Sequence, residues 1–436
     1  MNLDPIMIAV LGIILMIVLI FSGMNIAMVM FIVGFFGFAM VVNVKAAFGL
    51  LKTIPSNTAF NYSLSVVPLF ILMGHLAFHS GLSSSLYSSA EKWIGRLRGG
   101  LAMATVAACA GFSSICGSSG ATSATMGVVA YPEMKKHGYS PALVAGSICA
   151  GGTLGILLPP STAFIIYAIV AEQSIGRLFA AGILPGVLLT ICYILSVFVT
   201  TRLNPKTAPR GKSYSIKEKI VSLKGCIGII VLFLAVLGGM FAGFYSPTEA
   251  AAVGAFLTLL FMVINRKFTF KVFYKCIMDT VATTAMALFI VVSAMVFGYF
   301  ISITGLPREL SGFINDLHVN KYVIIAAILV MYVLLGSVLD GLAMLLITAP
   351  IFLPIVLDQG FSAIWFGVFV VMVQEIGLMT PPIGLNVFIV GGVLKEVPLQ
   401  TIFKGIVPFV LAALVAIVII IAFPPLATWL PGVFYG

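Results

Sequence analysis

Two copies of the pattern Gly-x-x-x-Pro-Pro stand inside long apolar stretches of the sequence, at residues 155–160 and 377–382. Two successive prolines remove two backbone donors, and a proline disfavours the helical conformation of the residue before it. We expect each helix to break here, leaving carbonyl oxygens that suit a hard cation such as Na+. The helix that resumes offers free N–H groups to an anion. For one copy alone, a proline kink packed against its neighbours explains the pattern equally well.

Upstream of each Pro-Pro pair, small polar residues interrupt another apolar stretch, at 99–131 and at 322–357. The interruptions consist of Ser113, Ser114, Gly117, Ser118, Ser119 and Gly120 in the first stretch, and of Gly336, Ser337, Asp340 and Gly341 in the second. This pattern is typical of a re-entrant hairpin, because non-helical backbone survives inside a membrane only where protein covers it or where it lines a cavity. Two tightly connected spans are the alternative interpretation.

The hairpin tips and the breaks supply the candidate binding residues. We expect Na+ ligands among Ser114, Gly117, Ser118, Gly155, Pro159, Gly336, Ser337, Asp340, Gly377 and Thr380. We expect an anionic substrate to bind near the helix starts, at Ser119, Gly120, Ser161, Thr162 and Asn386. Small residues let two backbones approach closely, and hydroxyl groups add oxygen atoms with little bulk. Helix packing alone is the alternative role for the serines.

Two acidic residues, Asp340 and Glu375, fall inside the predicted membrane segments. A charge buried there costs at least about 2.5 kcal/mol, so such residues are functional candidates. Asp340 either coordinates the cation or caps the second helix of its hairpin. Glu375 either couples to the cation or forms a local structural pair. His75 and His79 could relay protons, but no acid follows them nearby in the sequence, which favours interfacial packing.

The composition indicates that most of the chain lies in a lipid membrane. Hydrophobic residues make up 61% of the 436 residues and charged residues only 8%, against about a quarter in typical globular proteins. Apolar runs of roughly 17–25 residues are long enough to cross a membrane. The sequence therefore predicts an all-α polytopic protein surrounded by membrane lipid. The net charge of +10 lies in short loops without a basic, aromatic face, which excludes nucleic-acid binding. No catalytic motif is present, so we expect a secondary active transporter and no enzyme.

Charge also predicts the topology. If neither hairpin crosses the membrane, most of the 23 basic residues fall on one side, which the positive-inside rule makes cytoplasmic. The first hairpin then enters from the cytoplasm, the second enters from outside, and both termini lie outside.

The chain repeats itself at a nearly constant offset. Pro132, Gly138, Ser140, Gly155, Pro159 and Pro160 recur as Pro354, Gly360, Ser362, Gly377, Pro381 and Pro382. We expect two inverted repeats of about five spans and one hairpin each, with the binding site at their interface. The first repeat, 1–203, comprises scaffold spans 6–42, an arm and span 64–98, a cytoplasmic-side hairpin 99–131, a broken span 141–172 and a span 178–202. A cytoplasmic linker 204–224 leads to the second repeat, 225–436, with scaffold spans 225–265, a span 280–303, an outer-side hairpin 322–357, a broken span 363–394 and a span 403–426.

Five motifs in order along the chain carry a family resemblance. They are VPLFILMGHL at 67–76, CGSSGATSAT at 116–125, GGTLGILLPPSTAFIIYA at 151–168, SPTEAAAVGAF at 246–256 and QEIGLMTPPIGLNVF at 374–388. The sequence resembles the large membrane subunit (DctM-type) of tripartite ATP-independent periplasmic (TRAP) transporters, within the ion-transporter superfamily. The resemblance implies an elevator-type, Na+-driven importer in the bacterial inner membrane.

The resemblance also implies two partners, a small four-helix membrane subunit and a periplasmic substrate-binding protein. Substrates in this family are mostly organic acids, including C4-dicarboxylates, sialic acids and sulfonates. Because the chain begins directly at its first span, we expect the small subunit to be a separate chain. The leading hypothesis is Na+-coupled import of an organic anion, a carboxylate or a sulfonate, delivered by the binding protein. The alternative is a self-sufficient symporter or exchanger.

The predicted ion sites can be tested by enlarging their small side chains. Replacing Ser118 or Thr380 with a bulky residue should weaken the Na+ dependence of uptake, because the added volume displaces an oxygen ligand, while membrane insertion stays intact. Uptake rates measured against Na+ concentration test this expectation. Unchanged Na+ activation in both variants would contradict the assignment.

Overall fold

A computed structural model of the protein describes residues 4–316 and 319–436. Over these residues the chain is helical and has no β-strand. Seven helices in this part are long and apolar enough to cross a membrane, and a bent pair of helices brings the number to eight. The predicted all-α polytopic fold is therefore confirmed.

The helices follow one another through short connections. The first half of the chain forms α1 (Pro5–Phe21), α2 (Ile26–Val41), α3 (Val44–Ala59), α4 (Val66–His79), α5 (Leu82–Ile94), α6 (Gly100–Cys116), α7 (Ser119–Lys136), α8 (Pro141–Leu157), α9 (Thr162–Val170) and α10 (Ile175–Leu203). The second half forms α11 (Ile216–Leu223), α12 (Ile227–Phe233), α13 (Gly239–Phe241), α14 (Pro247–Ile264), α15 (Phe270–Ile303), α16 (Leu306–Asp316), α17 (Lys321–Gly336), α18 (Gly341–Asp358), α19 (Ala363–Gly377), α20 (Leu385–Val393), α21 (Leu399–Ala422) and α22 (Pro425–Tyr435).

Both predicted interruptions and both predicted breaks are present. Residues 117–118 separate α6 from α7, and residues 337–340 separate α17 from α18. The helix pair α8 and α9 bends by 40° across residues 158–161, and residues 378–384 separate α19 from α20. The peptide bonds Pro159–Pro160 and Pro381–Pro382 are both cis. The same order of hairpin and broken helix therefore occurs once in each half.

Several helices lie outside the predicted spans. The predicted spans do not include α3, α16 and α22, which are short or carry charged or polar residues and so lack a spanning signal. One span was predicted to begin at residue 280, whereas α15 begins at Phe270. The first ten residues of α15 include Lys271, Lys275 and Asp279, and these charges hid the start of the helix from a hydropathy criterion.

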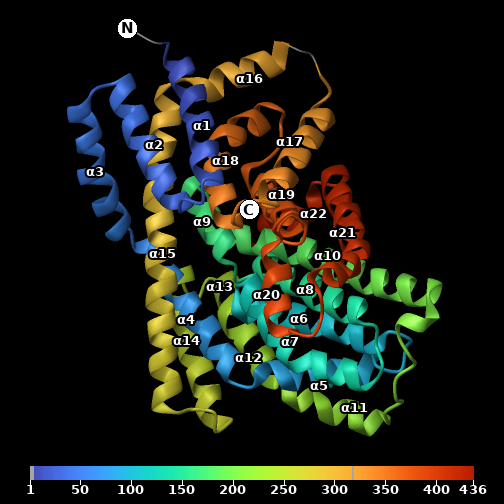
Figure 1. Cartoon of the computed structure of the whole chain (residues 1–436). Coiled ribbons are helices and arrows are strands. Elements are labelled where there is room, and N and C mark those ends of the chain that lie inside the picture. Colours follow the sequence, from blue (N-terminus) through green and yellow to red (C-terminus); the bar gives the residue numbers. More distant parts are fainter. Residues whose placement is uncertain (1–3, 317–318) are drawn as a thin grey trace.

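Two groups of helices make up the molecule (Figure 1). The long helix α15 packs along α2 and also contacts α3 and α4, and α4 packs against α14. In the other group, α8 lies at the centre and contacts α6, α7 and α21. Small residues allow α8 to pack closely against α21, because a Cβ atom on Gly146 would lie 2.2 Å from the backbone oxygen of Gly405 in α21.

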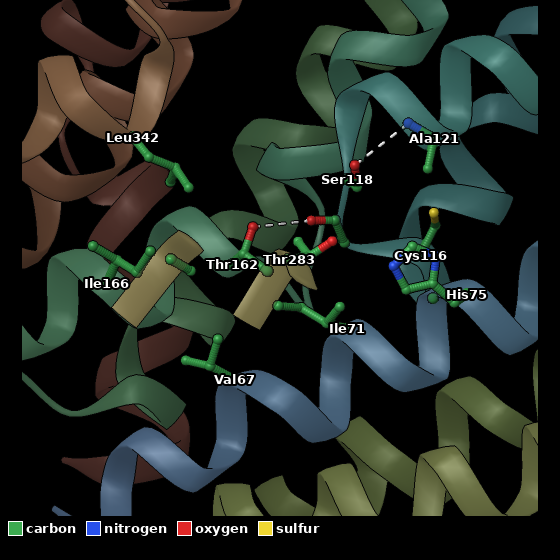
Figure 2. A pocket seen from close by; sticks show the side chains of 13 residues that line it. Val67, Ile71, His75, Cys116, Ser118, Ala121, Thr162, Ile166, Thr283 and Leu342 are labelled. Atoms are coloured by element: carbon green, nitrogen blue, oxygen red, sulfur yellow. Dashed lines mark hydrogen bonds between the residues drawn. The ribbon is translucent and has the colours of Figure 1, made fainter. Parts of the chain in front are cut away.

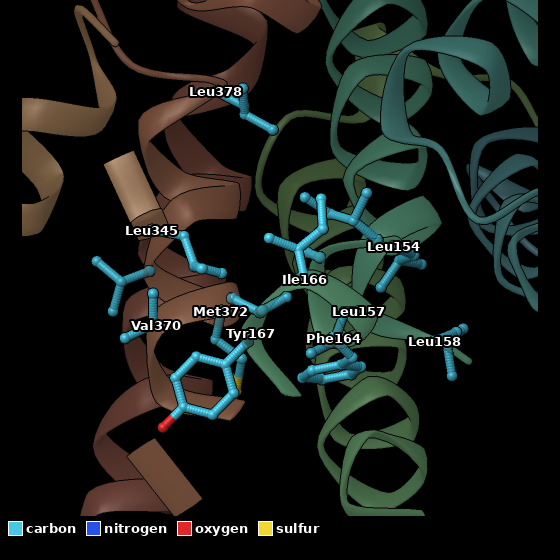
Figure 3. Close-up of a cluster of buried hydrophobic side chains, with 14 of the residues drawn as sticks. Leu154, Leu157, Leu158, Phe164, Ile166, Tyr167, Leu345, Val370, Met372 and Leu378 are labelled. Carbon is cyan, nitrogen blue, oxygen red and sulfur yellow. The ribbon is translucent and has the colours of Figure 1, made fainter. Parts of the chain in front are cut away.

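The two halves of the chain share one apolar core (Figure 3). Leu154, Phe164 and Tyr167 from the first broken helix face Leu345 of α18 and Val370 of α19, and all are buried. The Tyr167 hydroxyl also donates a hydrogen bond of 2.7 Å to the carbonyl of Ala363. Since neither half encloses these side chains alone, the halves must fold against each other.

The contact between α2 and α15 depends on glycine. A Cβ atom on Gly34 would lie 2.7 Å from the backbone nitrogen of Phe297, whereas one on Gly49 in α3 would meet nothing within 4 Å. We expect Gly34→Ala to lower the stability of the folded protein by about 1–3 kcal/mol through overpacking. The measurement is the thermal unfolding midpoint in detergent.

Gly49→Ala serves as the matched control, because it adds the same methyl group to a helix without a clash. Its midpoint should stay equal to or above that of the wild type, since alanine favours the helix. Equal loss of stability in both variants would show that the close approach of α2 to α15 is unimportant.

Candidate functional site

The first hairpin tip lies directly against the first helix break. The Thr162 hydroxyl donates a hydrogen bond of 3.2 Å to the carbonyl of Gly117. A Cβ atom on Gly155 would lie 2.5 Å from the Ser118 carbonyl oxygen, and one on Gly117 would lie 2.9 Å from the Pro160 carbonyl oxygen. Gly117 also has a φ of +63°, a conformation that favours glycine. The predicted residues Gly117, Ser118 and Gly155 therefore come together, backbone against backbone.

The second hairpin repeats this arrangement. The backbone N–H of Ile383, which follows the second Pro-Pro pair, donates a hydrogen bond of 3.2 Å to the Ser337 carbonyl. A Cβ atom on Gly377 would lie 2.6 Å from the carbonyl carbon of Gly336. Gly341 at the start of α18 packs against the side chain of Gln374. The predicted residues Gly336, Ser337 and Gly377 thus form a second cluster of the same kind.

A hydrogen bond joins the two halves. The Asn386 side-chain nitrogen at the start of α20 donates a hydrogen bond of 2.5 Å to the Ser119 hydroxyl at the start of α7. Both side chains are buried, and the side-chain oxygen of Asn386 has no partner among the described residues. Gly120 packs beside them, because a Cβ atom there would lie 2.9 Å from Ile389 of α20. Three predicted substrate residues from opposite halves therefore lie together.

A cavity of about 240 Å³ opens beside the first cluster (Figure 2). Its walls come from α4, from the first hairpin tip, and from α9, α15 and α18. Polar atoms at this wall come from His75, Cys116, Ser118, Thr162 and Thr283, and Leu342 brings the second hairpin to the same space. The remaining lining is largely apolar, which is typical of a small-molecule site with a few polar groups that orient the ligand.

Helix caps account for three of the predicted residues. The Ser118 hydroxyl accepts the N–H of Ala121, the Ser161 hydroxyl accepts the N–H of Phe164, and the Asp340 carboxylate accepts the N–H of Leu342. Asp340 therefore caps α18, which is one of the two roles expected of it, and a cap does not exclude contact with a cation. Each cap sits at the N-terminal end of its helix, where the helix dipole is positive.

Other predicted hydroxyl groups bond to their own helices. Each hydroxyl donates a hydrogen bond of 2.6 to 2.8 Å to a backbone carbonyl one turn earlier: Ser114 to Gly111, Ser337 to Leu334, and Thr380 to Ile376. Ser161 likewise donates to the carbonyl of Ile156. These bonds use the proton of each hydroxyl and leave lone pairs on the oxygen, so each oxygen is still able to accept a cation. Pro159 lies inside the first break itself.

Glu375 is fully buried in α19. Among the described residues neither of its carboxylate oxygens has a hydrogen-bond partner. Thr153 of α8 lies beside it, and the Thr153 hydroxyl is within 3.2 Å of the Tyr193 hydroxyl. The structure thus shows no local ion pair for Glu375 in the part of the chain that it describes.

His75 was not among the predicted site residues, although it lines the cavity. No acid follows the two histidines nearby in the sequence, but in the fold Asp279 of α15 is close enough to interact electrostatically with both His75 and His79. Because this acid is at least 200 residues away in the sequence, only the packing of α4 against α15 reveals it.

Comparison with known proteins identifies the family. Residues 13–426 match the family described as "Tripartite ATP-independent periplasmic transporter, DctM component". The chain belongs to the DctM family. It is therefore a multi-span membrane protein of the TRAP transporter class, and the resemblance inferred from the five motifs is confirmed.

Relatives in the DctM family match most of the chain. The C4-dicarboxylate TRAP transporter large permease protein DctM of Pseudomonas aeruginosa is 33% identical over 376 residues, which cover 86% of this chain and 87% of that protein. The isethionate TRAP transporter permease protein DctMQ of Oleidesulfovibrio alaskensis is 32% identical over 368 residues, which cover 84% of this chain and 57% of that protein. The crystal structure of the Alcanivorax borkumensis YdaH transporter shares the fold, with a TM-score of 0.67, 16% identity and 99% coverage of both chains.

The glycines at the breaks offer a direct test of the two clusters. If the two clusters bind Na+ as predicted, Na+ should stabilise the purified protein, and Gly155→Ala and Gly377→Ala should abolish this effect, because a methyl group at either position pushes the hairpin away from the break. The measurement is the thermal unfolding midpoint as a function of Na+ concentration, with K+ holding the ionic strength constant.

Gly392→Ala in α20 is the matched control, because a Cβ atom there would meet nothing within 4 Å. This variant should respond to Na+ as the wild type does. A full Na+ response in Gly155→Ala and Gly377→Ala would show that the two clusters do not bind the ion.

Proposed function

We propose that this chain is the transport subunit of a Na+-coupled importer of an organic anion, which a periplasmic binding protein delivers. The observation that carries the proposal is the pair of hairpin tips, each pressed backbone to backbone against a Pro-Pro break. Elements of both halves meet at the Asn386–Ser119 hydrogen bond and around one cavity. Membership of the DctM family supports the same function.

Na+ is the co-substrate in this proposal. The two clusters offer oxygen atoms only, from backbone carbonyls and from short hydroxyl side chains, and a hard cation prefers such ligands. The first Na+ binds among Ser114, Gly117, Ser118, Gly155 and Pro159, and the second among Gly336, Ser337, Asp340, Gly377 and Thr380. Glu375 lies two residues before Gly377, so its carboxylate belongs to the charge balance of the second site.

The substrate anion binds at the helix starts beside these clusters. Ser119, Gly120, Ser161, Thr162 and Asn386 stand at or next to the N-terminal ends of α7, α9 and α20, where N–H groups and the helix dipole favour negative charge. His75 adds a nitrogen donor from α4 on the opposite wall of the cavity. A carboxylate or a sulfonate satisfies this arrangement. The names of two relatives include a C4-dicarboxylate and isethionate, a sulfonate, which carry these two chemical groups.

Transport moves the hairpin group against a scaffold. We assign the scaffold to α1, α2, α14 and α15 and the moving group to the two hairpins with their broken helices, so that an elevator movement carries the cavity from one face of the membrane to the other. The two halves are inverted repeats in the bacterial inner membrane, with both termini periplasmic and the 204–224 linker cytoplasmic. The excess of Lys and Arg in the linker supports this orientation.

Two partners complete the transporter in this proposal. One is a small four-helix membrane subunit, and the other is the periplasmic binding protein. The name DctMQ of the isethionate relative, of which this chain covers 57%, fits a second subunit fused to the first. A self-sufficient symporter or exchanger is the alternative function.

Reconstituted uptake decides between these functions. The chain is placed in liposomes with the small subunit, and uptake of a labelled C4-dicarboxylate, sialic acid and isethionate is measured with and without the matching binding protein. We expect uptake only with an inward Na+ gradient and only with the binding protein. Uptake that persists without the binding protein would establish the alternative, and uptake that is equal in K+ would remove Na+ from the mechanism.

A further inference from the structure

Another cavity, which shares no lining residue with the first, is lined by four arginines. Arg96 and Arg98 follow α5, Arg202 lies in the last turn of α10, and Arg210 lies in the linker. Together they surround a space of about 880 Å³ that contains no acidic side chain among its lining residues. We call this space the arginine pocket.

Backbone contacts hold the arginine pocket in shape. Arg98 and Arg210 form an isolated antiparallel β-bridge. The backbone N–H of Gly99 donates a hydrogen bond of 3.5 Å to the carbonyl of Pro209. The Thr201 hydroxyl donates a hydrogen bond of 3.3 Å to the carbonyl of Arg98. Gly99 has a φ of +76°, and a Cβ atom there would lie 2.7 Å from Thr201. Segments that are distant in the sequence are therefore fixed against one another.

The positive charges of the arginine pocket are not neutralised within the protein. In the described part of the chain, ion pairs join Lys135 to Glu396 and His137 to Glu133, and none involves the four arginines. Arg202 stacks over the ring of Phe198 at 5.8 Å, which leaves the guanidinium edge free to donate. Four like charges around one space repel one another, so an anion between them is favourable.

Apolar surface continues directly from the arginine pocket. Leu97 and Phe198 line it and are 49% and 39% exposed, and Leu203 at the end of α10 is 80% exposed. Further along α10, Leu195 and Val199 are more than half exposed. This is the lipid-facing side of a spanning helix, because water would not favour so many exposed large side chains. The pocket therefore lies where the apolar face of α10 meets a charged linker.

We propose that the arginine pocket binds the phosphate group of an anionic phospholipid, whose acyl chains lie along the exposed face of α10. Guanidinium groups bind phosphate oxygens through paired hydrogen bonds, and basic pockets between membrane helices are suited to anionic headgroups. The adjoining apolar face argues for a lipid over a soluble phosphate. Bound there, the lipid bridges the end of α5, the end of α10 and the linker between the halves. This site is separate from the transport site and does not depend on the proposed function.

The test compares lipids and variants in the purified full-length chain. Native mass spectrometry counts bound lipid, and the thermal unfolding midpoint is measured with cardiolipin, phosphatidylglycerol, phosphatidylcholine and soluble glycerol phosphate. We expect the two anionic lipids to bind and to raise the midpoint, with no effect of phosphatidylcholine or glycerol phosphate. Arg98→Gln with Arg210→Gln should weaken anionic lipid binding about 30-fold, from the loss of two basic contacts.

Lys212→Gln with Lys217→Gln is the matched control, because it removes the same charge from the same linker outside the arginine pocket. It should bind anionic lipid as the wild type does. Arg202→Gln, which leaves the Arg98–Arg210 bridge intact, should also weaken binding and guards against a folding defect in the double variant. Equal weakening in the lysine control, equal binding of phosphatidylcholine, or equal stabilisation by glycerol phosphate would overturn the proposal.

Discussion

Backbone that leaves the helix inside a membrane has to be covered by protein, and this constraint organises the structure. Two segments with prolines, 158–161 and 378–384, depart from the helix, and a hairpin tip covers each one. A tip covers a break only if the two backbones lie in contact. For this reason Gly155 faces the carbonyl group of Ser118 in the first tip, and Gly377 faces that of Gly336 in the second. Glycine positions that look conformationally permissive in the sequence are therefore sterically restricted in the fold.

Close backbone approach then dictates the rest of the packing. Hairpins held this near to the broken helices need neighbours without bulk, and Gly146 and Gly405 give α8 and α21 that freedom. Large side chains come instead from neighbouring helices, where Tyr167 of α9 and Trp365 of α19 are both fully buried in the core shared by the two halves. Glu375 is also fully buried, and Thr153 of α8 lies beside it, so a carboxyl group of the second half is packed against a helix of the first half.

Much of this arrangement could be predicted from the sequence because its signals are local. The Pro-Pro pairs, the glycines before them and the small polar tips each change backbone geometry within a few residues, and all of them were located correctly. Signals that depend on distant segments were lost. The proximity of Asp279 to His75, the Ser119–Asn386 hydrogen bond and the Arg98–Arg210 bridge each join positions more than 100 residues apart. The helix α3 was missed for a different reason, because its lysines and polar residues lower its mean hydropathy.

The hydrogen bond from Asn386 to Ser119 has a thermodynamic consequence. It ties the start of α20, in the second half, to the start of α7, in the first, so a rearrangement at either position changes the energy of the other. Any ligand that tightens this bond from one half must be bound more tightly when the other half is occupied, and by the same factor in both directions. This bond adds a polar link between the halves to the apolar core that they share, and it is the one that joins the two helix starts directly.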